Sequence, residues 1–214
     1  ADESTASYSD DLGLDYSRSK LHGEREALKV AQKGLPLAIL RPVVILGPGD
    51  IYQSSTSTIL AFVRGKMPVY VEGRPSFGDV REMAAAHVAA LTKGRPGETY
   101  ILGGNNVTLT ELLAAIQDVT GVAPPPQVPY PLAYSIAGVI EYIAKLRHQH
   151  ASLSRQLAKA GHMCTWVSSD KAKAELGYSI RPLRDSLRDT IRFALHSGRL
   201  RPTTDKLRVL AQES

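Results

Sequence analysis

The chain has 214 residues and is 43% hydrophobic, which is enough apolar material for one large domain or two small ones. Charged residues make up 22%, and the 17 Gly and 13 Pro are ordinary numbers, so disorder and collagen-like repeats are excluded. The net charge of +5 is spread along the chain rather than clustered with aromatic residues, which argues against a nucleic-acid binder. A single cysteine, Cys164, excludes a disulfide framework.

The beginning of the chain predicts a helix followed by a strand. Apolar residues recur at helical spacing over residues 14–32, and a Gly and a Pro directly after this stretch end the helix. The apolar run of residues 37–46 is interrupted only by an Arg-Pro pair and is typical of a strand buried on both faces in a parallel sheet. Residues 47–50, Gly-Pro-Gly-Asp, predict a loop.

Strands and helices continue to alternate in the rest of the chain, which predicts an α/β fold with a more helical C-terminal part. Asp79 is placed to cap one helix, and Thr108 with Glu111 predicts a capping box on the next. Ser169 or Asp170 is expected to cap a later one. The predicted strands are 69–71, 100–102 and a short one near residue 128. The predicted helices are 59–64, 80–92, one opened by Thr108 and closed by Gly121, 132–146, 171–176 and 183–196.

Tyr16 and Lys20 are the strongest candidates for catalytic residues. Their spacing places both side chains on one face of the predicted helix, one turn apart. A nearby ammonium favours the phenolate and would lower the pKa of Tyr16 from its usual value near ~10, so this phenol could exchange a proton with a substrate hydroxyl or carbonyl. Such a pair also arises by chance in sequences with 9 Tyr, so the pair alone does not identify an enzyme.

Further motifs follow this pair in order along the chain. The Tyr-x-x-x-Lys helix is followed by a strand with Arg-Pro and a Gly-Pro-Gly exit, and then by residues 77–87, 97–112 and 169–178. In this order the motifs resemble the extended short-chain dehydrogenase/reductase family over nearly the whole chain. Residues 64–71 and 100–113 are most similar to its dihydroflavonol-reductase-like members and hopanoid-associated sugar epimerases.

The resemblance implies a site for a nicotinamide cofactor. Tyr16 would be the acid/base, and Lys20 would bind the nicotinamide ribose. Pro42, Val43 and Val44 would contact the nicotinamide. The implied chemistry is hydride transfer between NAD or NADP and a carbinol or ketone carbon of the substrate.

The resemblance also implies the substrate class and the organisation of the chain. Residues 1–58 would be the C-terminal portion of a Rossmann-type dinucleotide-binding domain. Residues 59–214 would be mainly a smaller, mixed and mostly helical substrate-binding subdomain, with 98–104 returning to the parallel Rossmann sheet. The expected protein is a cytoplasmic homodimer, paired through the Tyr16 helix. Its expected substrate is a small sugar or a flavonoid-like or sterol-like alcohol or ketone.

Arg74 is a weaker candidate for substrate binding. Related sugar epimerases place an Arg just before the aromatic residue of this segment to hold a phosphate, whereas Arg74 lies three residues before Phe77. A nucleotide-linked substrate is therefore less expected than a simpler one.

Two features of that family are not found before Tyr16. Neither a strand with a Gly-rich phosphate loop nor a Ser-bearing strand precedes it, and Gly47-x-Gly49 has Tyr52 where a third Gly is required. We therefore expect the chain to be the C-terminal part of such an enzyme, without activity on its own.

Other interpretations of single motifs remain. The pairs His148-x-His150 and His162-x-Cys164 lack a carboxylate or second Cys, so no metal site is expected. The apolar stretch 131–140 is too short to span a bilayer and fits either a membrane-surface helix or, more commonly, a core or pocket wall. The alternative function is a non-catalytic NAD(P)-binding or regulatory protein on the same scaffold.

Overall fold

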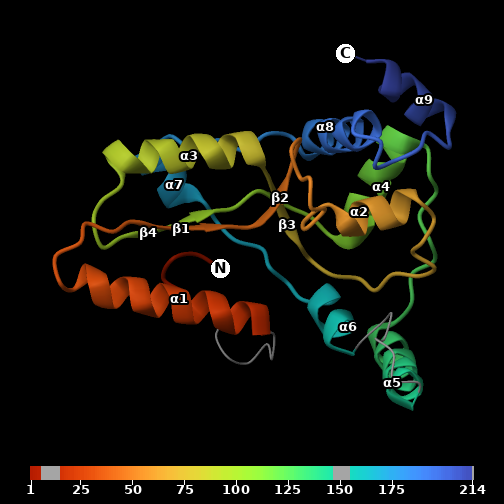
Figure 1. The fold of residues 1–214 in the computed structure, drawn as a ribbon, viewed down its shortest axis with the longest axis horizontal. Helices are drawn as coiled ribbons and strands as arrows, with labels where there is room; N and C mark the ends of the chain where they lie inside the picture. The colour runs from red at the N-terminus through yellow and green to blue at the C-terminus, as the bar shows by residue number, and fades with distance from the viewer. Residues whose placement is uncertain (6–14, 147–154, 214) are drawn as a thin grey trace.

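The computed structural model describes residues 1–5, 15–146 and 155–213 (Figure 1). Helices and strands alternate in the first half, and the second half is helical. The strands are β1 (Ile39–Pro42), β2 (Val44–Leu46), β3 (Ser76–Asp79), β4 (Thr99–Leu102) and β5 (Asn105–Asn106). The helices are α1 (Asp15–Ala31), α2 (Ser57–Val63), α3 (Val80–Lys93), α4 (Leu109–Thr120), α5 (Tyr130–Leu146), α6 (Arg155–Gly161), α7 (Asp170–Leu176), α8 (Leu183–His196) and α9 (Asp205–Gln212).

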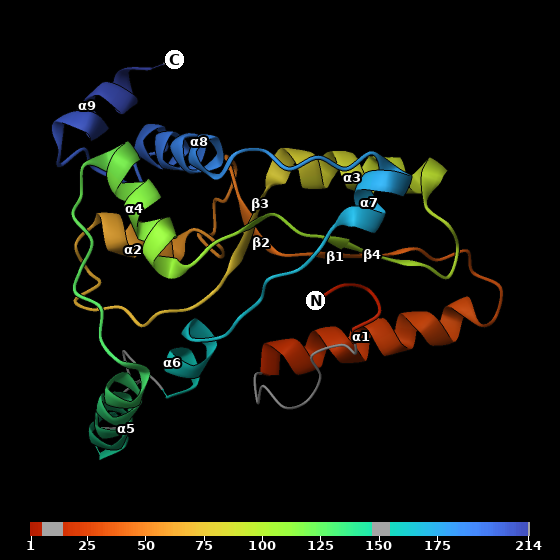
Figure 2. The same cartoon turned by 180° about the vertical axis from the view of Figure 1, so that it is seen from behind.

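Parallel pairing joins strands that are far apart in the sequence. β1 pairs in parallel with β4, with Leu40 opposite Tyr100, and β2 pairs in parallel with β3, with Val44 opposite Phe77. β5 adds to β3 in antiparallel orientation. α3 and α7 lie on one side of the β1–β4 pair and α1 lies on the other (Figures 1 and 2). The predicted α/β class is confirmed.

Two predicted helix caps are confirmed by their hydrogen bonds. Asp79 is the N-cap of α3, where its side chain accepts a hydrogen bond from the Arg81 N–H at 2.9 Å. Thr108 and Glu111 form the predicted capping box at the start of α4. Gly121 ends α4 in the left-handed conformation with φ 74°, which glycine adopts without steric cost. Each N-cap contributes about 1 kcal/mol, so these boundaries are fixed locally.

The strands predicted at residues 69–71 and near Val128 do not form. A single isolated bridge joins Tyr70 and Gln127 instead. Prolines lie on both sides of this bridge in the second segment and lack the N–H that a longer ladder needs. The two segments are therefore adjacent but irregular.

Two further predictions need correction. The apolar run 37–46 is divided into β1 and β2, which pair with different strands, and Val44 is 40% exposed, so the run is not buried on both faces. Ser169 stands at the N-cap of α7, but its hydroxyl accepts a hydrogen bond from the Gly103 N–H at 2.7 Å and does not cap the helix. This hydroxyl instead ties α7 to the residue that follows β4.

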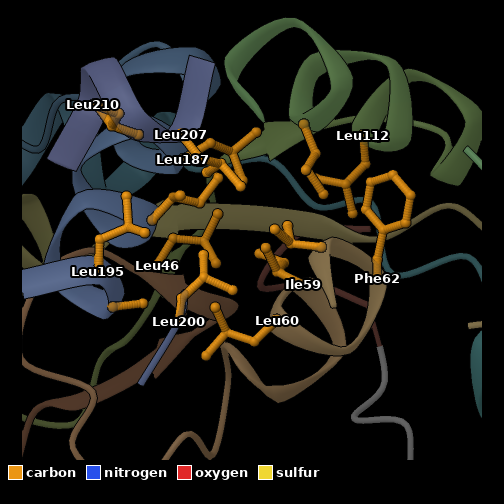
Figure 3. Packing of buried hydrophobic residues seen from close by; sticks show 14 of the residues in the cluster. Leu46, Ile59, Leu60, Phe62, Leu112, Leu187, Leu195, Leu200, Leu207 and Leu210 are labelled. Atoms are coloured by element: carbon orange, nitrogen blue, oxygen red, sulfur yellow. The ribbon is translucent and has the colours of Figure 1, made fainter. Parts of the chain in front are cut away.

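The main core lies where β2, α2, α4, α8 and α9 converge (Figure 3). Its fully or almost fully buried side chains include Leu46, Ile59, Leu60, Phe62, Leu112, Leu187, Ile191 and Leu207. A second buried cluster lies among α3, β4 and α7 and includes Met83, Tyr100, Leu102, Ala172 and Leu176. Among the side chains that the structure describes, neither cluster includes one from α1 or α5.

Candidate active site

A cleft of about 860 Å³ opens where β1 passes into β2. Its walls come from the start of α1, the β1–β2 junction, the loop before α2 and the chain that follows α6. The N-terminal residues also reach it. The lining residues are Ala1, Asp2, Thr5, Tyr16, Arg41, Pro42, Val43, Val44, Ile45, Ser54, Ser55, Thr58, Ile101, Met163, Cys164, Thr165, Trp166 and Val167.

Tyr16 lies in the first turn of α1 and forms part of the cleft wall. Its side chain is 73% exposed, so its hydroxyl is available to a bound molecule. The Lys20 ammonium lies one turn further along, 5.5 Å from the centroid of the Tyr16 ring. The helical spacing therefore does place a positive charge next to the phenol, although Lys20 is not one of the lining residues.

Pro42, Val43 and Val44 lie at the break between β1 and β2, and all three line the cleft. The Val43 N–H donates to the Leu102 carbonyl at 3.1 Å, which holds this break against the end of β4. Val44 is 40% exposed, so its apolar side chain forms part of the cleft surface. Of the six predicted site residues, four therefore line the same cleft. They are Tyr16, Pro42, Val43 and Val44.

Arg41 is a lining residue whose side chain joins β1 to α1. Its guanidinium donates to the Glu24 carboxylate through Nε, at 3.1 Å, and also through Nη2. This two-pronged pair fixes the orientation of both groups. It helps to hold α1, and with it Tyr16, beside the strand. The sequence analysis did not predict this contact. The only indication of it in the sequence is that Arg41 is a charged residue within the apolar run 37–46.

Residues 163–167 form another part of the cleft wall, and Arg74 holds them in place. The Arg74 N–H donates to the Met163 carbonyl at 3.0 Å, and the Thr165 N–H donates to the Arg74 carbonyl at 2.8 Å. The Arg74 guanidinium lies 5.5 Å from the ring of Trp166, whose Nε1–H donates to the Val107 carbonyl at 3.1 Å. Arg74 therefore contacts the cleft wall without being one of the lining residues.

Asp50 organises the loop before α2, which contributes Ser54 and Ser55 to the cleft. Its carboxylate accepts hydrogen bonds from the backbone N–H groups of Ser54, Ser55 and Thr56, at 3.1, 3.1 and 3.0 Å. Partial burial alone would raise the pKa of Asp50, but these hydrogen bonds and one from the Thr56 hydroxyl lower it. The ionised carboxylate thus keeps Ser54 and Ser55 on the cleft surface.

The polar N-terminal residues, which had no predicted role, lie along the cleft. The Glu3 carboxylate accepts a hydrogen bond from the Ile101 N–H of β4 at 2.8 Å, and the Ser168 N–H donates to the Ala1 carbonyl at 2.8 Å. Ser4 donates to Asp2 at 2.6 Å and does not line the cleft. Ser7 and Ser9 lie outside the described residues.

No group of three or more His, Cys, Asp and Glu side chains gathers anywhere in the described part of the chain in a way that would hold a metal ion. His148 and His150 lie outside that part. His162 stacks on Tyr130 at 4.4 Å between ring centroids, and its Nδ1 lies 2.7 Å from the Glu72 carbonyl oxygen. Within the same described ranges, no helix is long and apolar enough to cross a membrane.

Comparison with known sequences decides the family. Residues 2–103 match the NAD dependent epimerase/dehydratase family. A protein of Synechocystis sp. that bears the name dihydroflavonol 4-reductase is 33% identical over 204 residues, which are 92% of this chain and 60% of that protein. This chain belongs to the NAD-dependent epimerase/dehydratase family. The predicted resemblance and the predicted NAD-type cofactor class are confirmed at the level of the family.

Solved structures share the fold. The crystal structure of gox2253 matches with a TM-score of 0.78 and 36% identity, over 94% of this chain and 62% of that one. A nucleoside-diphosphate-sugar epimerase from Pseudomonas aeruginosa matches with a TM-score of 0.73 and 27% identity, over 88% of this chain and 57% of that one. The Rossmann-type fold class is confirmed. The chain spans about 60% of the length of these relatives.

Proposed function

We propose that the protein is an NAD(P)-dependent oxidoreductase or epimerase in which Tyr16 is the acid/base for reaction at a carbinol or ketone carbon. The observation that carries this proposal is one cleft containing Tyr16 together with Pro42, Val43 and Val44. NAD or NADP, when bound, would accept or supply the hydride.

The residues at the β1–β2 junction suit a nicotinamide ring. Pro42 and Val44 present exposed apolar groups to the cleft, and the adjoining backbone supplies carbonyl oxygens for a carboxamide. Lys20 lies close enough to Tyr16 to bind the attached ribose and to favour the ionised phenol during proton transfer. A cleft of about 860 Å³ has room for this end of the cofactor and a small substrate.

The rest of the cleft supports a substrate with both polar and apolar parts. Hydroxyl groups of Ser54, Ser55 and Thr58 offer donors and acceptors, whereas Met163 and Trp166 present apolar surface that excludes water. A sugar and a flavonoid-like or sterol-like alcohol or ketone both fit this description. Sterol demethylase protein B of Methylococcus capsulatus is 34% identical over 110 residues, which are 51% of this chain and 34% of that protein.

The organisation predicted from the sequence belongs to the same proposal. It comprises residues 1–58 as part of the cofactor domain, residues 59–214 as mainly the substrate side, a cytoplasmic location and a homodimer paired through α1. Leu28 and Val30 of α1 are 38% and 48% exposed, which supports pairing through this helix.

The test is turnover by the full-length protein with NADH, NADPH or their oxidised forms, offered a panel of sugars, dihydroflavonols and sterol ketones. Tyr16→Phe removes the proton donor and is expected to lower kcat by about 10²–10⁴-fold. Tyr52→Phe is the matched control, because Tyr52 is 87% exposed and is not one of the lining residues. It is expected to leave kcat unchanged.

Two outcomes would contradict the proposal. One is full turnover by Tyr16→Phe on a substrate that the wild type converts. The other is stoichiometric dinucleotide binding in a calorimeter with no turnover of any panel member, which would favour the non-catalytic alternative.

A further inference from the structure

α5 carries a stripe of apolar side chains that the rest of the described structure leaves uncovered. The stripe residues recur every three or four positions and so share one face of the helix. They are Leu132, Ile136, Val139 and Tyr142, with exposed fractions of 50%, 44%, 59% and 65%. On another face, Ala133 and Ala137 are 5% and 0% exposed. Contiguous exposed apolar surface of this kind marks an interaction site.

α5 and α6 form a hairpin that stands apart from the sheet and its covering helices (Figures 1 and 2). α5 packs mainly on α6. Between the two helices, Arg155 Nε donates to the Glu141 carboxylate at 2.9 Å, and the Arg155 guanidinium lies 5.8 Å from the Tyr134 ring. These contacts fix the inner side of the hairpin and leave the stripe directed outward.

The hairpin is positively charged next to this stripe. The described part of the hairpin, residues 130–146 and 155–161, contains three basic residues, Lys145, Arg155 and Lys159, and a single acidic one. That acidic residue, Glu141, is already paired with Arg155. Lys145 is exposed in the last turn of α5, beyond Tyr142. An apolar helix face beside basic residues is the pattern of helices that lie in the interface of an anionic membrane.

Two other occupants of the stripe fit less well. α5 has 17 residues and, like the other described helices, does not qualify as a membrane span. Four half-exposed side chains on one helix also supply much less than the roughly 800 Å² per partner that a stable dimer buries. A lipid surface needs no such area, because binding scales with the apolar groups inserted plus the attraction of basic side chains.

We propose that α5 docks the protein on an anionic membrane surface, with the stripe at the acyl-chain boundary and Lys145 among the headgroups. α6 leads directly into residues 163–167, the cleft wall that contains Trp166, so docking would bring the cleft close to the lipid. Delivery of a membrane-dissolved substrate to that cleft rests on the proposed function, whereas docking itself does not.

The test is sedimentation of the full-length protein with vesicles of equal parts phosphatidylcholine and phosphatidylglycerol, compared with phosphatidylcholine alone. We expect about tenfold stronger binding to the anionic vesicles. Ile136→Ser with Val139→Ser should weaken that binding about tenfold or more, because both apolar groups leave the interface. Lys145→Glu should weaken it about fivefold and only on anionic vesicles.

The matched control variants make the same types of substitution at exposed positions outside the α5–α6 hairpin. Val88→Ser with Leu91→Ser changes two α3 side chains that are 68% and 85% exposed, and Lys33→Glu changes an exposed lysine after α1; both should bind like wild type. Equal binding by the α5 variant and the wild type would overturn the proposal, as would no anionic preference. A stripe variant that instead converts a dimer into a monomer in sedimentation velocity would assign the stripe to a second copy and also overturn it. Vesicle binding needs no turnover, so it is measured separately from the proposed chemistry.

Discussion

The end of β3 and the cleft at the β1–β2 junction lie on adjacent strands but differ in burial and in polar pairing. At the end of β3, the Asp79 carboxylate is fully buried and accepts hydrogen bonds from Arg81 Nε at 2.8 Å and from the Ser186 hydroxyl at 2.7 Å. In the cleft, Tyr16 is 73% exposed and Val44 is 40% exposed. The Asp79 carboxylate is satisfied within the protein, whereas the side chains of the cleft remain available to a ligand.

The difference separates the part of the chain that stabilises the fold from the part that binds. Arg81 bridges Asp79 to Asp189 of α8 at 2.7 Å, so one guanidinium joins the β3–α3 turn to the main core. Tyr16 lies on a helix that contributes nothing to the buried clusters. Substitutions at the first region should therefore change stability, and substitutions at the second should change binding or turnover.

The largest effect on stability is expected for Asp79→Asn. The amide cannot accept both hydrogen bonds of the Arg81 fork, and the partly buried arginine keeps only Asp189 as a carboxylate partner, so the free energy of unfolding should fall by about 4 kcal/mol at pH 7. Urea unfolding measures this change. Asp205→Asn is the control, because its side chain is 93% exposed and a change within about 0.5 kcal/mol is expected.

The same substitution should change the pH dependence of stability. Burial alone would raise the pKa of Asp79, but hydrogen bonds from Arg81 and Ser186 outweigh it and hold the pKa well below its usual range. A carboxylate with a lowered folded-state pKa stabilises the protein above its unfolded pKa near ~4, and this contribution is lost as the pH falls further. Wild type should lose stability more steeply than Asp79→Asn below about pH 4. Parallel curves would contradict this assignment.

Leu187→Ala should be the next largest in effect. Leu187 is 0% exposed in the cluster of Figure 3, and its truncation should cost about 3 kcal/mol of unfolding free energy by leaving a cavity. Turnover of the folded variant should match wild type at a temperature below the transition. Val209→Ala, at a 60% exposed position of α9, should cost less than about 0.5 kcal/mol.

Asp50→Asn should produce an intermediate effect that appears mainly in binding. The amide keeps the shape of the side chain but accepts the N–H groups of Ser54, Ser55 and Thr56 less well, which should cost about 1–2 kcal/mol of stability and raise KM about tenfold. Steady-state kinetics with unfolding curves separate the two readouts. Asp118→Asn, at an exposed position of α4, is the control. An unchanged KM would show that this loop does not shape the substrate site.

Arg74→Gln should have the smallest effect. Loss of the contact with the Trp166 ring is worth about 1 kcal/mol, so KM should rise about fivefold with kcat unchanged. Arg155→Gln, which removes a similar contact with Tyr134 on the α5–α6 hairpin, should leave KM unchanged. A large loss of kcat in Arg74→Gln would mean that this guanidinium acts on the reacting atoms directly.

Local signals predicted helices better than strands. The box of Thr108 and Glu111 and the cap at Asp79 depend on residues two or three apart, and both were predicted from the sequence. β3, α6 and α9 were not predicted. The β3 sequence Ser-Phe-Gly-Asp is buried at all four positions, between β2 and β5 and in contact with α3 and α8, so it shows no alternation of buried and exposed residues that would predict a strand.

The candidate site shows the same limit. The spacing of Tyr16 and Lys20 and the Arg-Pro-Val-Val run indicated one side of the cleft. Met163 and Trp166 were expected in a pocket or in the core, but their place in the same cleft as Tyr16 was not predicted. Trp166 is held there by contacts with Arg74 and Val107, which are 92 and 59 residues away in the chain. Such contacts depend on tertiary packing and leave no periodic signal in the sequence.

The central claim is that the nicotinamide binds in the cleft between the β1–β2 junction and Trp166, and fluorescence tests it most directly. Trp166 is the single tryptophan of this sequence, and tryptophan emission overlaps the absorption of NADH or NADPH. Titration of the full-length protein with either dinucleotide should quench Trp166 emission and produce sensitised nicotinamide emission, and Trp166→Phe should lose the Trp166 part of that signal. Stoichiometric binding by calorimetry without a change in Trp166 emission would place the nicotinamide elsewhere and contradict the claim.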